Sequence, residues 1–336
     1  MLIYRMLKKI NFLDHLSLVL VFPFLLFLSL NIYKDYGISI DEESTRLHGL
    51  VSLNYICELF FPNQQFEFQV KNDIPLLNEY PFKEYGVFFE IILIFLIEIL
   101  FNVTNFNEIF YLRHLFTNFL FLSSLIFFYI ISLSLFKSKF ISLISVLILY
   151  TSPRIFAESF YNDKDIVFLS IFIYLVFFSI RFLQKTNYLN AFILSLILAI
   201  TINIRVVGIY MLFLIIFFSF MQILMKKNFN LKKIYILIFF FFSSFFLLFI
   251  LWPFLWEAPF SNFLFSLKSF SKYPWGGNVF YLGNFYQAQY LPWHYFFVFF
   301  FATTPLFLSL IIISGVCSII LRFIKRLVKV EESKPQ

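Results

Sequence analysis

Long runs of apolar residues, separated by short basic turns, restrict most strongly what this chain can fold into. The runs lie near residues 14–33, 109–136, 140–153, 166–183, 189–204, 206–225, 234–251 and 294–321. A helix needs about 20 apolar residues to cross the hydrocarbon core of a membrane, and the shorter runs are tolerable only inside a bundle. Because 61% of the 336 residues are hydrophobic and only 13% are charged, no soluble core could bury this surface. The sequence predicts an all-α polytopic membrane protein with about eight or nine transmembrane helices.

The positions of the basic residues predict the topology. Lysine and arginine lie mostly at the ends of apolar runs, where they mark the cytoplasmic side. With eight spans, the basic residues in 5–9, 137–139, 181–185, 226–233 and 322–329 all fall on that side. Both termini are then cytoplasmic, in what we expect to be a bacterial inner membrane. The same distribution accounts for the net charge of +7 without a nucleic-acid partner.

Residues 85–101 are the one ambiguous apolar segment. A crossing here would invert every later turn and would place Glu90 and Glu98 at membrane depth, which is costly. We therefore expect a shallow or re-entrant helix on the outer side, with a ninth crossing as the alternative. The outer face then consists of 34–84, with juxtamembrane helices, 154–165 and 252–293. Without internal repeats, residues 1–336 are predicted to form a single domain.

The first outer loop begins with a pair of acids directly after the first span. Asp41 and Glu42 lie at the membrane surface, where the headgroup of a lipid-borne substrate would be. If this stretch is helical, Glu42 and Arg46 share one face at spacing i, i+4. An alternative interpretation is that Ser39 or Asp41 only caps a surface helix. The two interpretations are compatible, because a cap can also carry a catalytic carboxylate.

Transfer of a sugar from a phosphate carrier requires a carboxylate and cations. The carboxylate deprotonates the attacking hydroxyl, and the cations hold the departing phosphate. Lys83, Lys164 and Arg205 offer cations on the outer face. Lys164 could instead snorkel at the interface. Arg205 interrupts the apolar stretch 189–225, and ionisable residues in such places are functional by default.

The second outer loop adds two acids, Asp163 and Asp165. They could orient the acceptor, cap the helix that begins near Ile166, or join Asp41 around a divalent ion such as Mg²⁺ or Mn²⁺. The sequence leaves these three possibilities open.

A series of short motifs resembles a known superfamily. In order, the chain has the Asp41–Glu42 pair, a lysine before an apolar run, an Arg-His pair at 113–114, a Ser-Pro-Arg motif at 152–154 followed by the Lys-Asp pair 164–165, and LPWHY at 291–295. This order resembles the GT-C membrane glycosyltransferases. It is most similar to bacterial members of glycosyltransferase family 39, akin to protein mannosyltransferases and lipid A aminoarabinose transferases.

The resemblance implies a function and roles for individual residues. It implies transfer of a sugar from a polyprenyl-phosphate donor to an acceptor hydroxyl on the periplasmic face, in contact with membrane lipids. Asp41 matches the general base, with Glu42 as the nearest rival. Lys83 matches a lysine near the carrier phosphate, where Arg46 and Arg205 would also act. Asp165 matches the second-loop acid, next to Asp163 and Lys164 in a site for the acceptor.

Two other functions remain alternatives. The first is a transporter or flippase for a lipid-linked sugar, and the second is a non-catalytic assembly subunit with the same fold. A transporter typically has ionisable residues near the midplane and inverted structural repeats. Here the polar residues gather at one face and no repeat is visible, which favours the enzyme.

Overall fold

The structure of the protein is a computed structural model, which describes residues 16–62, 74–224, 231–271 and 276–332. The basic residues in 5–9 and at 226–227, and parts of the outer loops 34–84 and 252–293, lie outside the described residues. Among those described, the regular structure is helical apart from the short strands β1 (Asn278–Tyr281) and β2 (Asn284–Gln287).

The apolar runs form helices, as the sequence predicts. In the described part of the chain, five segments are long and apolar enough to cross a membrane: α5 (Phe106–Phe136), α8 (Asp165–Gln184), η4 (Val206–Gly208) with α10 (Ile209–Leu224), α11 (Leu231–Ile250) and residues 306–325 of α14 (Leu306–Glu332). A sixth is obtained if α6 (Lys139–Thr151) and α7 (Pro153–Tyr161) are taken together, and α2 (Leu16–Ile32) and α9 (Tyr188–Ile204) are shorter apolar helices. These helices indicate an integral membrane protein.

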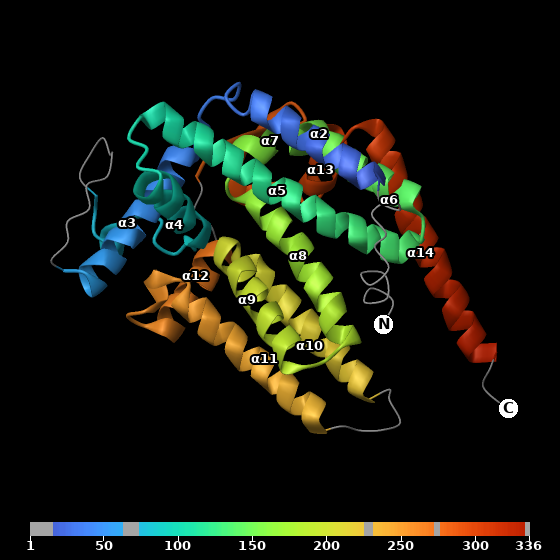
Figure 1. Ribbon diagram of the computed structural model, residues 1–336. Coiled ribbons are helices and arrows are strands. Elements are labelled where there is room, and N and C mark those ends of the chain that lie inside the picture. Colours follow the sequence, from blue (N-terminus) through green and yellow to red (C-terminus); the bar gives the residue numbers. More distant parts are fainter. Residues whose placement is uncertain (1–15, 63–73, 225–230, 272–275, 333–336) are drawn as a thin grey trace. The chain divides into compact units, whose positions relative to one another are not determined.

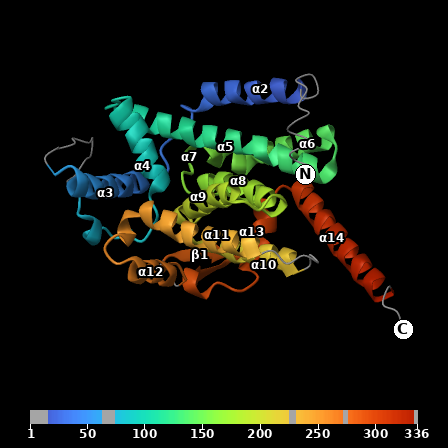
Figure 2. The same ribbon diagram turned by 60° about the horizontal axis from the view of Figure 1, so that its bottom comes forward.

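The chain divides into two compact units, residues 1–272 and 273–336. In the first unit, α8, α9 and α11 run side by side, with α5 packed against α8 (Figure 1). Figure 2 shows α2 lying along α5 on the side away from α8. Trp252, Leu198 and Phe240 are fully buried in the main apolar core, which α8 to α11 enclose.

Two prolines break helices within apolar runs. The run at 140–153 ends where α6 and α7 meet at an angle of 65°, with Pro153 as the first residue of α7. The run at 294–321 is divided between α13 (Tyr295–Thr303) and α14, which begins after Pro305. Proline has no backbone N–H and disfavours a helical conformation in the residue before it, so each helix ends there.

The first outer loop folds into a helix that packs on residues 85–101. The helix is α3 (Glu42–Phe60), and its neighbours are α4 (Phe88–Ile94) and the π-helical turn η3 (Phe95–Leu100). A Cβ atom at Gly49 would lie 2.8 Å from Cβ of Glu90, so glycine permits the close approach of α3 and α4. Together α4 and η3 have 7 and 6 residues, about 20 Å of helix, against roughly 30 Å of hydrocarbon.

Asn203 fixes the end of α9 against two other elements. Its buried amide accepts a hydrogen bond from the backbone N–H of Phe88 (2.9 Å) and donates one to the carbonyl of Leu251 (3.0 Å). The backbone of Gly86 lies so close to Asn203 that an added Cβ would overlap its carbonyl group. This contact sets the position of Arg205, two residues further along the chain.

Candidate functional site

A buried cluster of charges joins the first outer loop to the helical bundle. Arg113 of α5 is almost fully enclosed, and its Nη2 donates to Oε2 of Glu90 (2.5 Å) and to Oδ2 of Asp163 (2.9 Å). The hydroxyl of Thr45 in α3 donates to the same oxygen of Asp163 (2.5 Å). The Arg113 guanidinium therefore joins α5 to α4 and to the turn before α8, and Thr45 joins α3 to the same turn through Asp163.

A buried ion pair and a buried carboxylate–histidine contact extend this cluster. Arg46 forms a two-pronged contact with Glu98 of η3, at 2.9 Å from Nε and 2.6 Å from Nη2. Glu42 lies 2.9 Å from Nε2 of His114 through one oxygen and accepts the backbone N–H of Ser39 (2.6 Å) through the other. The sequence places Glu42 and Arg46 on one helix face, and both are buried there. The structure gives each of them a structural partner.

Burial perturbs the acids of this cluster. Loss of solvent raises the pKa of Glu90 to about 7, although the neighbouring Arg113 opposes the shift. Burial also raises the pKa of Asp163 above its ordinary value, against the same guanidinium. A buried site with two carboxylates on one cation therefore favours keeping a proton on one of the acids.

Asp41 has a different environment from its neighbour Glu42. It is the residue before α3, but its side chain makes no capping hydrogen bond, and it is exposed. The side chain of Glu42 instead accepts the backbone N–H of Ser39, three residues earlier. The capping interpretation of Asp41 is thus not supported, and its carboxylate remains accessible to a ligand.

The turn before α8 places three charged side chains in different surroundings. Asn162 caps the helix by accepting the backbone N–H of Asp165 (2.7 Å). Asp163 points into the buried cluster, whereas Asp165 is exposed and forms an ion pair with Arg205. Lys164 lies between them, with its Nζ 4.7 Å from the ring centroid of Tyr85.

These groups line an open recess of about 380 Å³. Its walls consist of Ser39, Ile40, Asp41, Tyr161, Asn162, Asp163, Lys164, Asp165 and Arg205. A second recess of about 240 Å³ shares Arg205 and extends past Tyr85 and Gly86 to Phe270. The recess lies at the ends of apolar helices. It is lined by Asp41, whose carboxylate makes no capping hydrogen bond, and by the cations Lys164 and Arg205.

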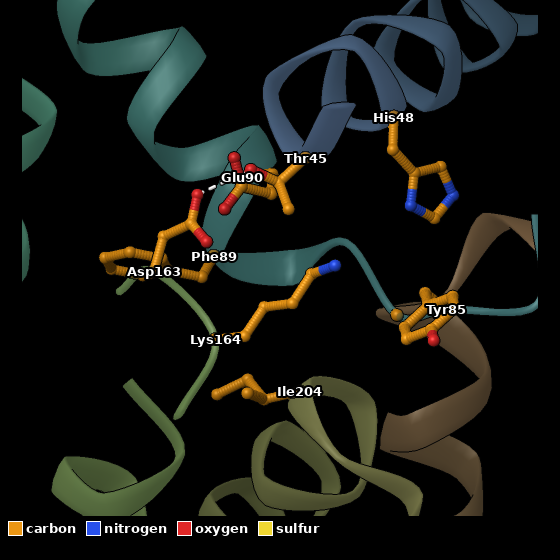
Figure 3. Close-up of a pocket in the computed structure, with 9 residues that line it drawn as sticks. Thr45, His48, Tyr85, Phe89, Glu90, Asp163, Lys164 and Ile204 are labelled. Atoms are coloured by element: carbon orange, nitrogen blue, oxygen red, sulfur yellow. Dashed lines mark hydrogen bonds between the residues drawn. The ribbon is translucent and has the colours of Figure 1, made fainter. Parts of the chain in front are cut away.

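Lys164 also reaches a narrow pocket behind this recess. Figure 3 shows its side chain extending from Asp163 and Glu90 toward Tyr85 and His48. His48 is buried and stacks on Tyr80 with 5.0 Å between ring centroids, and its Nε2 has no hydrogen-bond partner among the described residues. Burial and the nearby Lys164 lower the pKa of His48 to about 3, so its ring is neutral near pH 7.

Lys83 lies apart from the recess. Its ammonium group donates to the backbone carbonyl of Asn78, whose amide donates to Glu257 (2.9 Å). The structure therefore brings together Asp41, Asp163, Lys164, Asp165 and Arg205. Lys83 lies elsewhere, Glu42 is buried against His114, and Arg46 lies in a buried ion pair with Glu98.

The sequence did not single out Glu90, Glu98 and His48 as parts of the site. The two glutamates did carry a signal, because acids in an apolar segment require partners. Their partners, Arg113 and Arg46, are 23 and 52 residues away and could not be assigned from spacing.

No group of three or more His, Cys, Asp or Glu side chains in the described part of the chain is arranged to hold a metal ion. Asp163 and Asp165, the expected metal ligands beside Asp41, each already face an arginine. This donor set does not fit a Mg²⁺ or Mn²⁺ site, because two guanidinium groups would oppose the cation.

The chain matches no protein-family model, no curated protein and no solved structure.

Proposed function

We propose that this protein is a glycosyltransferase that moves a sugar from a polyprenyl-phosphate donor to an acceptor hydroxyl in the recess. One observation carries the proposal: the uncapped carboxylate of Asp41 shares the recess with Lys164 and Arg205. A carboxylate and two cations are the groups that displacement of a phosphate by a hydroxyl needs. The apolar helices beside the recess suit a donor with a lipid tail.

Asp41 acts as the general base in this scheme. The acceptor oxygen forms a bond to the anomeric carbon while the bond from that carbon to the phosphate oxygen breaks. The phosphate leaves with the electron pair, and the hydroxyl proton passes to Asp41. Glu42 cannot readily substitute for it, because its two oxygens are turned to His114 and Ser39.

Arg205 and Lys164 hold the phosphate in this scheme. Arg205 is about one-third exposed and faces the more exposed Asp165, so the phosphate, which gains a second negative charge as it leaves, can replace that carboxylate as its partner. In the described structure, the ammonium group of Lys164 lies over the face of the Tyr85 ring and makes no hydrogen bond. Its three N–H donors are therefore available to phosphate oxygens.

The topology proposed with this function has eight crossings and both termini in the cytoplasm. Support comes from the basic residues at the turns and from the length of α4 and η3, which is too short to cross. The recess then opens on the periplasmic side of a bacterial inner membrane. Reporter fusions after Lys137 and after Gln287 test this arrangement, with a cytoplasmic signal expected only at Lys137.

Single-turnover transfer from a purified polyprenyl-phosphate sugar, detected by mass spectrometry, tests the role of Asp41. We expect Asp41→Asn to transfer about 10²–10⁴-fold more slowly at an unchanged melting temperature, because only the general base is lost. Glu43→Gln is the matched control, since Glu43 is the next exposed acid but does not line the recess. Near-normal transfer by Asp41→Asn would contradict the assignment of the base. If the unaltered protein transfers no sugar from any such donor, the proposed function is wrong.

A further inference from the structure

The part of the chain from 273 to 321 contains no Asp, Glu, Lys or Arg, and it is the longest such stretch in the sequence. The absence of charges is expected in α13 and in most of α14, because these are apolar helices. The same reason does not explain the absence of charges in the hairpin of β1 and β2, which is rich in Tyr, Phe, Asn and Gln. An uncharged hairpin that is both aromatic and amide-rich is unusual at a surface facing bulk water, where about a quarter to a third of the residues are normally charged.

The two faces of the hairpin differ in exposure. Phe280 pairs directly with Phe285, so their rings share one face, and they are 64% and 74% exposed. Tyr281 lies on the other face and is buried. Its hydroxyl is 2.6 Å from Nδ1 of His294, and its ring is 5.1 Å from that of Tyr295. The apolar pair therefore faces away from the rest of this unit.

The turn of the hairpin adds a third apolar side chain. Leu282 and Gly283 both have positive φ angles, 48° and 85°. A two-residue turn of this kind favours Asn-Gly or Gly-Gly, and a leucine there is strained. Leu282 is 68% exposed, so no packing inside the described structure compensates for the strain. A leucine in this position is best explained by a partner for its side chain.

The link to His294 ties the hairpin to the start of the last apolar run. His294 immediately precedes α13, the start of the last apolar run. Tyr281 holds the hairpin to this point, and if the last apolar run spans the membrane, the hairpin lies where the chain passes from water into lipid. Aromatic side chains concentrate at this boundary, and the neighbouring Trp293 is 83% exposed.

We propose that residues 278–287 form a membrane anchor in which Phe280, Leu282 and Phe285 insert between the lipid headgroups and the upper acyl chains. The partner is the bilayer itself. A lipid boundary accepts apolar rings and leaves the Asn and Gln side chains among headgroups and water, and it requires no charged residues. The anchor is independent of the transferase proposal, since none of its residues lines the recess.

Spin labelling of the protein in vesicles of phosphatidylcholine and phosphatidylglycerol tests the anchor. Single cysteines are introduced as Phe280→Cys and Phe285→Cys in a background with Cys57→Ala and Cys317→Ala, and nitroxide labels are attached. Asn284→Cys is the matched control, because Asn284 is exposed on the opposite face of the same hairpin. Collisions with oxygen report lipid, and collisions with a water-soluble nickel chelate report water.

Labels at positions 280 and 285 should collide severalfold more with oxygen, relative to the nickel chelate, than the label at 284. Equal or greater nickel access at 280 and 285 would place the phenylalanine face in water and overturn the proposal. Strong immobilisation with little access to either reagent would also overturn it, because a protein surface would then cover the hairpin. Two independent label positions guard against local disturbance by one substitution.

Discussion

Replacing Arg113 with methionine removes the only guanidinium bonded to both Glu90 and Asp163 in the described structure. Methionine retains much of the side-chain length and apolar volume but carries no charge. Arg113 is 2% exposed, so water cannot solvate the two carboxylates that it leaves. Removing one partner of a buried ion pair costs about 3–5 kcal/mol. We expect a loss of this size in the free energy of unfolding.

The matched control is Arg154→Met. Arg154 bonds to Glu158 at 2.7 Å, one helical turn away, but its side chain is 58% exposed. An exposed pair of this kind contributes about 0–1 kcal/mol. The two variants thus remove the same type of cation from environments that differ mainly in burial. Reversible unfolding in mixed detergent micelles, followed by helix circular dichroism, measures both losses.

The double variant Arg113→Met with Glu90→Gln separates charge from packing. If uncompensated charge is the cause, neutralising Glu90 should recover part of the lost free energy, and the two losses should not add. A loss for Arg113→Met no greater than that for Arg154→Met would refute the electrostatic reasoning. Strict additivity in the double variant would indicate that packing, rather than charge, is responsible.

Two further predictions concern the same region. Gly86→Ala should destabilise the protein by about 1–3 kcal/mol, because its new methyl group overlaps the backbone of Asn203, whereas Gly276→Ala, with nothing within 4 Å, should change the unfolding free energy little. Burial raises the pKa of Glu90 from 4.5 to about 7, so its contribution to stability is complete below pH 4.5 and is lost as the pH rises through 7. Unfolding measured across this range should show a decline with rising pH that is weaker in Glu90→Gln; parallel curves would contradict the shift.

The sequence predicted the helices well because hydrophobicity along the chain is a local property. The run at 206–225 corresponds to residues 206–224 of the structure, and the run at 166–183 to α8. Arg205, which interrupts the apolar stretch in the sequence, lies between α9 and η4. The full number of crossings stays a prediction, because helix length alone does not establish which segments span.

The candidate site was less predictable because it depends on contacts between distant segments. Asp163 and Asp165 are two residues apart and looked equivalent in the sequence. The turn capped by Asn162 directs one into the buried cluster and the other to the recess. Asp41 and Glu42 differ in a similar way: Asp41 precedes α3 and is exposed, whereas Glu42 begins α3 and is buried. Neighbouring acids acquire different environments from backbone geometry that neither hydropathy nor spacing encodes.

The position of Arg113 has a consequence for how the chain is assembled during synthesis. Glu90 precedes Arg113 by 23 residues, and Asp163 follows it by 50. As the chain emerges from the ribosome, the arginine can be neutralised at once by an acid already made, and α5 can enter the bilayer without an unpaired cation. The turn that carries Asp163 arrives later and meets an arginine that is already in place and already paired with Glu90. The raised proton affinity of the two acids lets that second carboxyl group dock without bringing a full extra charge. Biogenesis can therefore proceed in chain order, with each charge compensated as it appears.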